Sequence, residues 1–231
     1  MNTLSLASIE TPKAAARRLM VNKIKEGYEA EALHTYTDNE GNTLYWRIRM
    51  KHETLGKYIR PMAFINGEYV LKEPQYSHGE KPLYNLHQLA IVTHKTVFIV
   101  EGEKCADALN KLGLLATTSG GADSVRSTSF EILASRDVII WRDNDDAGIK
   151  FKNDLIEKLQ PLNCNIKLVD IATLNLPHKG DCVDWLATFE KQHSHMANVE
   201  DIHALPLKYD LTQTPTSDYL QEGKASVLTE S

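Results

Sequence analysis

The sequence predicts an α/β protein with a mainly parallel sheet, preceded by a small α+β segment that contains antiparallel hairpins. Residues 96–100 and 137–141 are apolar runs rich in β-branched residues, and a helical pattern follows each of them. Strands that are buried on both faces of a parallel sheet have this composition. The hairpins are predicted by Asn66-Gly67, a strong two-residue turn signal that separates residues 58–65 from 68–71.

The composition is that of an ordinary globular protein, with 42% apolar and 25% charged residues. The formal net charge of −5 is unevenly distributed, because residues 1–60 contain ten Lys/Arg against seven Asp/Glu. The amino-terminal part is therefore the expected phosphate-facing surface. Cys105, Cys164 and Cys182 are too scattered for a disulfide framework or a zinc motif, and the sequence has neither a membrane-length apolar run nor a signal-peptide pattern. These features predict a cytoplasmic protein without a membrane partner.

Residues 1–32 are predicted to be a helical segment. Thr11-Pro12 is a helix-start signal, and apolar residues at helical spacing from Ala16 to Ile24 predict one amphipathic helix over 13–32. The basic residues on its other side fit a solvated face, and they also fit a contact with a nucleic-acid backbone or a partner protein.

Residues 33–94 are predicted to be an antiparallel, β-rich segment. Strands are expected at 33–37, 43–50, 58–65 and 68–71, an irregular loop at 73–84 and a short helix at 85–91. The candidate nucleic-acid-binding residues are Arg47, Arg49, Lys51, Lys57 and Arg60. Such a basic, aromatic-edged sheet can follow single-stranded nucleic acid by stacking and phosphate contacts. A sheet with one solvated face shows the same alternation of charged and apolar residues, so both interpretations stay open.

Carboxylates follow both apolar runs of the predicted parallel sheet. Glu101 ends the first run, and Asp143-Asn144-Asp145 ends the second. Loops at the carboxyl ends of such strands share one edge, and side chains two apart on an extended segment point the same way, so Asp143 and Asp145 are expected to share a cation with Glu101. Oxygen ligands suit Mg²⁺ or Mn²⁺ together with substrate phosphates. Taken singly, Asp145 also fits a helix cap.

The remaining elements are predicted in order along the chain. Strands are expected at 114–118 and 165–169 and helices at 129–135 and 181–191, with a turn at Ser119-Gly120-Gly121 and a polar, acidic tail over 193–231. His193, His195 and His203 are expected to be exposed, because no carboxylate or thiolate lies at a metal-binding spacing from them.

The runs 97–109 and 143–148 resemble the Toprim domain that topoisomerases and bacterial primases share, and in particular its phage and plasmid primase-helicase branch. The resemblance covers about 95–192, and a looser similarity to the strand-rich segment ahead of Toprim covers 33–94. It implies a Toprim-like Rossmannoid fold. It also implies that Glu101, Asp143 and Asp145 form the metal site, and the similarity of 178–186 to a later acidic motif adds Asp181 and Asp184. Many relatives have an aspartate where this chain has Cys105, which implies weaker binding of a second metal ion.

The resemblance implies a DNA primase-type nucleotidyltransferase that acts in replication with Mg²⁺ or Mn²⁺. Glu101, Asp143, Asp145 and Lys104 are the implied catalytic residues, with Lys104 contacting phosphates. The expected partners are single-stranded DNA or RNA, nucleoside triphosphates and a replicative helicase. Two alternatives share the same acids: a Toprim nuclease, and a non-catalytic accessory protein that binds nucleic acid or a partner with a reduced metal site.

Overall fold

The computed structural model describes residues 10–76 and 79–210, and the chain divides into two compact units between Ile91 and Val92. The elements of the first unit are α1 (Pro12–Leu19), α2 (Val21–Lys25), β1 (Glu29–Thr37), β2 (Thr43–His52), β3 (Gly56–Ile65), β4 (Glu68–Val70) and α3 (Leu86–Ile91). The strands form an antiparallel sheet in the order β1-β2-β3-β4. The predicted hairpins and the short helix near residue 85 are therefore confirmed.

The single helix predicted over 13–32 is wrong in its second half. Helix α1 ends at Leu19, α2 ends at Lys25, and Gly27 then takes a left-handed conformation with φ of +93°. Strand β1 begins two residues later, where Glu29 pairs with Lys51 of β2. Strand pairing with a distant segment thus overrides the local helical pattern, which sequence periodicity cannot reveal.

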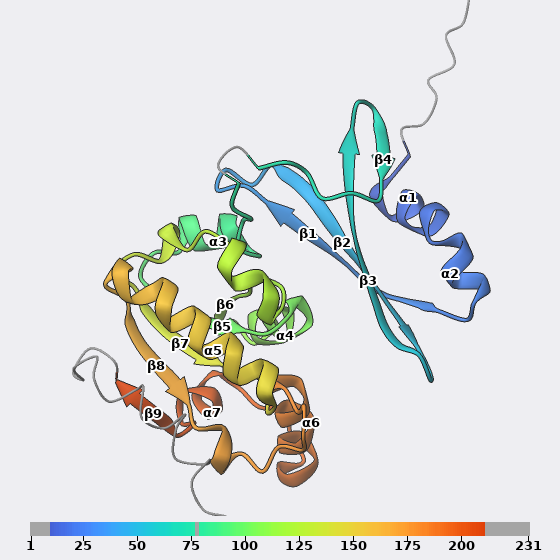
Figure 1. Cartoon of the computed structure of the whole chain (residues 1–231). Coiled ribbons are helices and arrows are strands. Elements are labelled where there is room, and N and C mark those ends of the chain that lie inside the picture. The colour runs from blue at the N-terminus through green and yellow to red at the C-terminus, as the bar shows by residue number, and fades with distance from the viewer. Residues whose placement is uncertain (1–9, 77–78, 211–231) are drawn as a thin grey trace, which may run out of the picture. The chain divides into compact units, whose positions relative to one another are not determined.

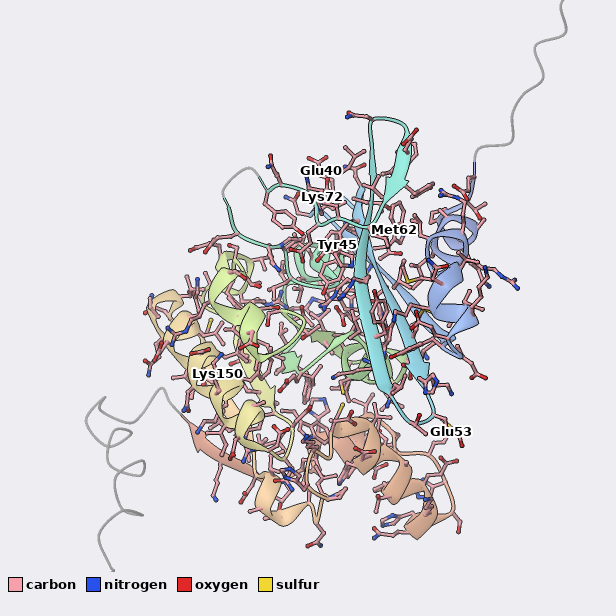
Figure 2. The ribbon with its side chains drawn as sticks, turned by 45° about the vertical axis from the view of Figure 1, so that its right-hand side comes forward. Glu40, Tyr45, Glu53, Met62, Lys72 and Lys150 are labelled. Carbon is pink, nitrogen blue, oxygen red and sulfur yellow. The ribbon has the colours of Figure 1, made fainter. Side chains whose placement is uncertain are left out.

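The core of the first unit lies on one face of the sheet. Ile48, Met50 and Met62 pack there against Ala15 and Met20 of the helical segment, and Figure 1 shows α1 and α2 along this side of the sheet. On the other face Tyr36 stacks on Tyr45 with ring centroids 4.4 Å apart, and both rings are buried. Figure 2 labels Met62 and Tyr45, which represent the two faces.

The second unit is built on a five-stranded sheet in the order β6-β5-β7-β8-β9, in which the first four strands are parallel. Its elements are β5 (Val97–Val100), α4 (Glu103–Lys111), β6 (Leu115–Thr117), β7 (Asp137–Trp141), α5 (Asp146–Leu159), β8 (Asn165–Val169), α6 (Cys182–His193), α7 (Val199–His203) and β9 (Leu207–Asp210), with 3₁₀ turns at 122–127, 131–133, 160–162 and 171–173. The chain is therefore an α/β protein with a mainly parallel sheet, as predicted.

Helices cover both faces of this sheet. Strands β6 and β8 lie on opposite sides of the β5–β7 pair, so right-handed crossovers place α4 and α5 on opposite faces. Helix α6 packs against α4, and Trp185 of α6 meets Trp141 of β7 edge to face at 5.7 Å between ring centroids. In Figure 1 helix α5 passes in front of the strands. The carboxyl ends of β5 and β7 are thereby left between the first turns of three helices.

Two predictions for this unit need correction. The helix predicted at 129–135 is a single 3₁₀ turn at 131–133. The tail predicted to begin at 193 contains α7 and β9 as far as residue 210, because Leu207 and Lys208 pair with Val169 and Leu168 of β8; its remainder, 211–231, lies outside the described residues. The three histidines of this region are exposed, as predicted.

No helix in the described part of the chain is long and apolar enough to cross a membrane.

The first unit should depend on its methionine-rich core. Met62 is fully buried in that core, so Met62→Ala should lower the free energy of unfolding by about 2–5 kcal/mol in urea titrations. Leu55 lies in the β2–β3 turn with 65% of its surface exposed and serves as the matched control, for which Leu55→Ala should be nearly neutral. Equal effects of the two substitutions would contradict this assignment of the core.

Candidate functional site

The predicted metal-binding residues lie around the carboxyl ends of β5 and β7. We call this region the acidic edge; its residues are Glu101, Asp143, Asp145, Asp181 and Asp184. Val100 and Trp141 are in register as the last paired residues of the neighbouring strands, so Glu101 and the 142–145 loop leave the sheet side by side. The adjacency that the sequence predicted for Glu101 and Asp143 is present in the strand order.

Asn144 joins this loop to the segment that leads into α6. Its backbone N–H donates to the carbonyl of Gly180 at 2.9 Å, and its own carbonyl accepts from the N–H of Lys179 at 3.0 Å. Its side-chain amide donates to the carbonyls of Leu176 and Pro177 at 2.9 and 3.1 Å. These four bonds bring Asp181 beside Asp143, although the two residues are far apart in sequence. The sequence reasoning missed Asn144, whose signal was its position between two aspartates.

Two glycines allow the close backbone contacts of the acidic edge. A Cβ atom on Gly148 would lie 2.2 Å from the carbonyl oxygen of Asp143, which is far inside van der Waals contact. A Cβ atom on Gly180 would lie 2.9 Å from the carbonyl oxygen of Pro177. Both positions therefore require glycine because another backbone segment occupies the space of a side chain.

Three of the five acids also cap helices. The Asp145 carboxylate accepts from the N–H of Gly148 at 2.8 Å and caps α5. Asp181 accepts from the N–H groups of Val183 and Asp184, and the Asp184 carboxylate accepts from the N–H of Asp181 at 3.0 Å, which completes a capping box on α6. The capping role that the sequence allowed for Asp145 is thus present. A carboxylate has two oxygens, so a cap does not use up its capacity to bind a cation.

Cys105 lies inside the acidic edge, on the first turn of α4. Its side chain is buried, and a hydrogen bond with the Cys182 thiol, together with burial, raises the pKa of the Cys105 thiol well above its usual value. The charges of Asp181 and Asp143 act in the same direction. The thiol is therefore close to both carboxylates and stays protonated at neutral pH.

Arg142 supplies positive charge beside the acids. Its guanidinium donates to the carbonyl of Asp143 at 2.7 Å. Burial lowers the pKa of Arg142, while the charges of Asp145 and Asp143 oppose that shift. Lys104 is half-buried on the first turn of α4, next to Glu103. One oxygen of the Glu101 carboxylate is buried.

A threonine that the sequence reasoning missed ties the neighbouring loop to the acidic edge. The Thr118 hydroxyl accepts from the N–H groups of Gly102 at 3.1 Å and Gly120 at 3.0 Å. It thereby joins the turn after β5 to the turn after β6. The Ser119-Gly120-Gly121 stretch is a turn, as predicted, and it holds the backbone next to Glu101 in place.

The donor atoms of the acidic edge fit a hard divalent cation. All five side chains offer carboxylate oxygens, which Mg²⁺ and Mn²⁺ prefer. Within residues 10–76 and 79–210, no three His, Cys, Asp or Glu side chains are already close enough together to hold a metal ion. The residues therefore fit in chemical kind and in position, and their carboxylates would have to turn toward one another to bind an ion.

The basic residues of the first unit fall on two faces of its sheet. Arg47, Arg49, Lys51 and Lys57 share one face, where Lys51 and Lys57 are directly opposite each other and Arg49 pairs with Glu31 at 2.6 Å. Arg60 is in register with Ile48 and so lies on the other face. Strand register therefore divides the five candidate residues between two faces, with Arg60 apart from the other four.

Arg60 belongs to a separate aromatic group on that other face. Its guanidinium lies over the Tyr58 ring at 4.6 Å from the centroid, and Lys23 lies over the same ring at 4.9 Å. These are cation–π distances, so Arg60 has a structural partner within its own unit.

No protein-family model and no curated protein matches the sequence. Among solved structures, the chain is similar to the crystal structure of the Aquifex aeolicus primase (zinc binding and RNA polymerase domains), with a TM-score of 0.48 and 15% sequence identity over 87% of this chain. The chain spans about half the length of that structure, 51% of it. A similarity of this size transfers no activity, substrate or partner.

Gly148 should be essential to the geometry of the acidic edge. Gly148→Ala should destabilise the fold by about 1–3 kcal/mol in urea titrations, because the new methyl group overlaps the Asp143 carbonyl. Gly121→Ala is the matched control, since a Cβ there meets nothing within 4 Å, and it should cost less than about 1 kcal/mol. If both variants were equally stable, the close approach at Gly148 would not exist in solution.

Proposed function

We propose that this chain is a Toprim primase-like protein that carries out Mg²⁺-dependent nucleotidyl transfer on nucleic acid during replication. The observation that carries the proposal is the hydrogen-bonded junction at Asn144, which gathers Asp143 and Asp181 next to the strand end that bears Glu101. Three separate segments of the chain thus deliver carboxylates to one edge of a parallel sheet, where α/β proteins bind their ligands. The resemblance of the same residues to the Toprim motifs supports this assignment.

Glu101, Asp143 and Asp145 would hold the cation, with Asp181 and Asp184 in reach from α6. A bound Mg²⁺ or Mn²⁺ would stabilise negative charge on the transferred phosphoryl group. Asp145 would bind through the oxygen that does not cap α5. Arg142, which already lies beside Asp143, would limit repulsion among the acids, and Lys104 would face the triphosphate.

The Arg47 face of the first unit is the proposed contact for a single strand. It carries four basic side chains, Arg47, Arg49, Lys51 and Lys57, and Arg49 pairs with Glu31. Positive side chains spaced along paired strands can follow a phosphate backbone without reading its sequence. Nucleoside triphosphates and a replicative helicase remain the proposed further partners.

A non-catalytic binding role is the second candidate, and the capping of three acids favours it. Asp145, Asp181 and Asp184 stabilise helices whether or not a metal is bound. The protein should be incubated with single-stranded templates, labelled nucleoside triphosphates and Mg²⁺ or Mn²⁺. Extended products would support the primase, shortened templates would identify the nuclease alternative, and bound but unchanged templates would identify the binding role.

Metal affinity should depend on Asp143. Asp143→Asn should weaken Mn²⁺ binding at least about tenfold in calorimetric titrations, because it removes a charged ligand. The fold should be unchanged or slightly more stable without metal, since the substitution removes one of the negative charges gathered at the acidic edge.

Asp146→Asn is the matched control for this measurement. Asp146 is exposed on the first turn of α5, three residues from Asp143, and lies outside the proposed ligand set. Its variant should keep the affinity of the wild type for Mn²⁺. Equal Mn²⁺ affinities of the wild type, Asp143→Asn and Asp146→Asn would show that the metal binds elsewhere or does not bind.

Nucleic-acid binding should be sensitive to one face of the first sheet only. Replacing Arg47, Lys51 and Lys57 by alanine should weaken binding to a single-stranded oligonucleotide. It should also reduce the slope of log affinity against log salt by about two units, because a protein that makes fewer phosphate contacts releases fewer counterions from the nucleic acid. Arg60→Ala, on the opposite face, should leave the slope unchanged. A larger loss from Arg60→Ala than from the triple variant would assign binding to the other face.

A further inference from the structure

Two buried cysteines meet inside the acidic edge. Cys105 is on the first turn of α4 and Cys182 is the first residue of α6, and these helices pack against each other. Neither residue belongs to the proposed set of metal ligands, and the proposed reaction uses neither thiol. They lie between the two turns that carry Glu101 and Asp181.

The two cysteine residues are in direct contact. The Cys182 thiol donates to the backbone carbonyl of Cys105 at 3.8 Å, so its sulfur lies against the first turn of α4 that carries Cys105. Cys105 exposes 3% of its surface and Cys182 exposes 2%. Both cysteines are in the free, reduced form.

Cys164 provides an internal comparison. It is also buried and reduced, but it lies just before β8 and its thiol donates to the carbonyl of Leu133 at 3.1 Å. No second thiol is described next to it. Any chemistry that requires two adjacent thiols should therefore involve Cys105 and Cys182 and leave Cys164 unchanged.

We propose that Cys105 and Cys182 form a reversible dithiol–disulfide pair, which is oxidised by exchange with a small-molecule disulfide and then links the first turns of α4 and α6. In the first step one cysteine sulfur attacks the small disulfide, forms a mixed disulfide and releases one small thiol. In the second step the other cysteine sulfur displaces the second small thiol. The protein loses two S–H bonds and gains one S–S bond, while the small disulfide is reduced to two thiols.

Burial makes this pair slow to react in the folded state. An oxidant can reach the thiols only when the first turn of α6 opens, so exchange should follow local opening and not the faster kinetics of an exposed thiolate. Once formed, the bond would fix α6 to α4, because an S–S bond of about 2.05 Å replaces a longer non-bonded contact.

The link would also alter the metal site, and this consequence rests on the proposed function. Asp181 caps α6 immediately before Cys182, so a shift of this turn moves one proposed ligand relative to Asp143. The oxidised protein should bind Mn²⁺ about tenfold more weakly than the reduced protein, as is usual when the groups that orient metal ligands are disturbed.

The test uses the full chain treated with excess oxidised glutathione under native conditions, followed by alkylation of free thiols and mass spectrometry. The expected product has lost two hydrogen atoms, and its digest contains a linked peptide with Cys105 and Cys182 and an alkylated Cys164. Dithiothreitol should restore three free thiols. Cys164→Ser should oxidise to the same extent as the wild type, whereas Cys105→Ser and Cys182→Ser should not form the link.

Peptide mapping of the wild type decides the proposal even if a cysteine variant fails to fold. A linked peptide that contains Cys164, a stable mixed disulfide on one cysteine, or three free thiols after prolonged oxidation would each overturn it. Mn²⁺ titration of the oxidised and reduced forms is a separate readout. If neither form bound Mn²⁺ but the link formed, the proposed metal site would fail and the thiol pair would stand.

Discussion

The acidic edge depends on the four hydrogen bonds of Asn144, because they hold together loops whose side chains repel each other. Asp143 and Asp181 both carry negative charge, and no covalent link joins their segments. Each hydrogen bond contributes about 0.5–1.5 kcal/mol net, so the two backbone and two side-chain bonds of Asn144 can together offset the repulsion of a partly solvated carboxylate pair. Gly148 and Gly180 make this junction possible by leaving room for the backbone. The positions of the proposed ligands therefore follow from the hydrogen bonds of Asn144 and the close backbone contacts at the two glycines, whereas repulsion between the carboxylates opposes these positions.

Positive charge at the same edge reduces that repulsion further. Arg142 lies beside Asp143 and Asp145, and the amino-terminal ends of α5 and α6 direct their unsatisfied N–H groups and partial positive charge toward Asp145 and Asp181. Helix capping and metal binding use the same carboxylates, and both interactions favour the ionised form. The capping hydrogen bonds thus hold these carboxylates at the helix ends before any cation arrives.

Much of the fold could be predicted because it follows from local patterns. The apolar runs became β5 and β7, and Asn66-Gly67 became the β3–β4 turn, since strand composition and turn chemistry act over a few residues. The missed features depend on distant partners. The helical pattern ends before Gly27, because the residues that follow pair with β2. Strand β9 forms because the edge of β8 is free to pair with it. Arg60 and Arg47 lie on opposite faces because of the register between β2 and β3. Asn144 could be placed only once its partners 32 to 36 residues onward were known.

The Cys105 thiol affects how many negative charges the acidic edge carries. An aspartate there would place a further carboxylate near Asp143 and Asp181 at a position that is almost fully buried. Burial and like charges would both raise its pKa, so it would stay ionised only with a cation nearby. A neutral thiol avoids that cost and lets α4 pack closely on α6 through Cys182. The buried cysteines therefore add no negative charge to the acidic edge and allow the first turns of α4 and α6 to pack closely.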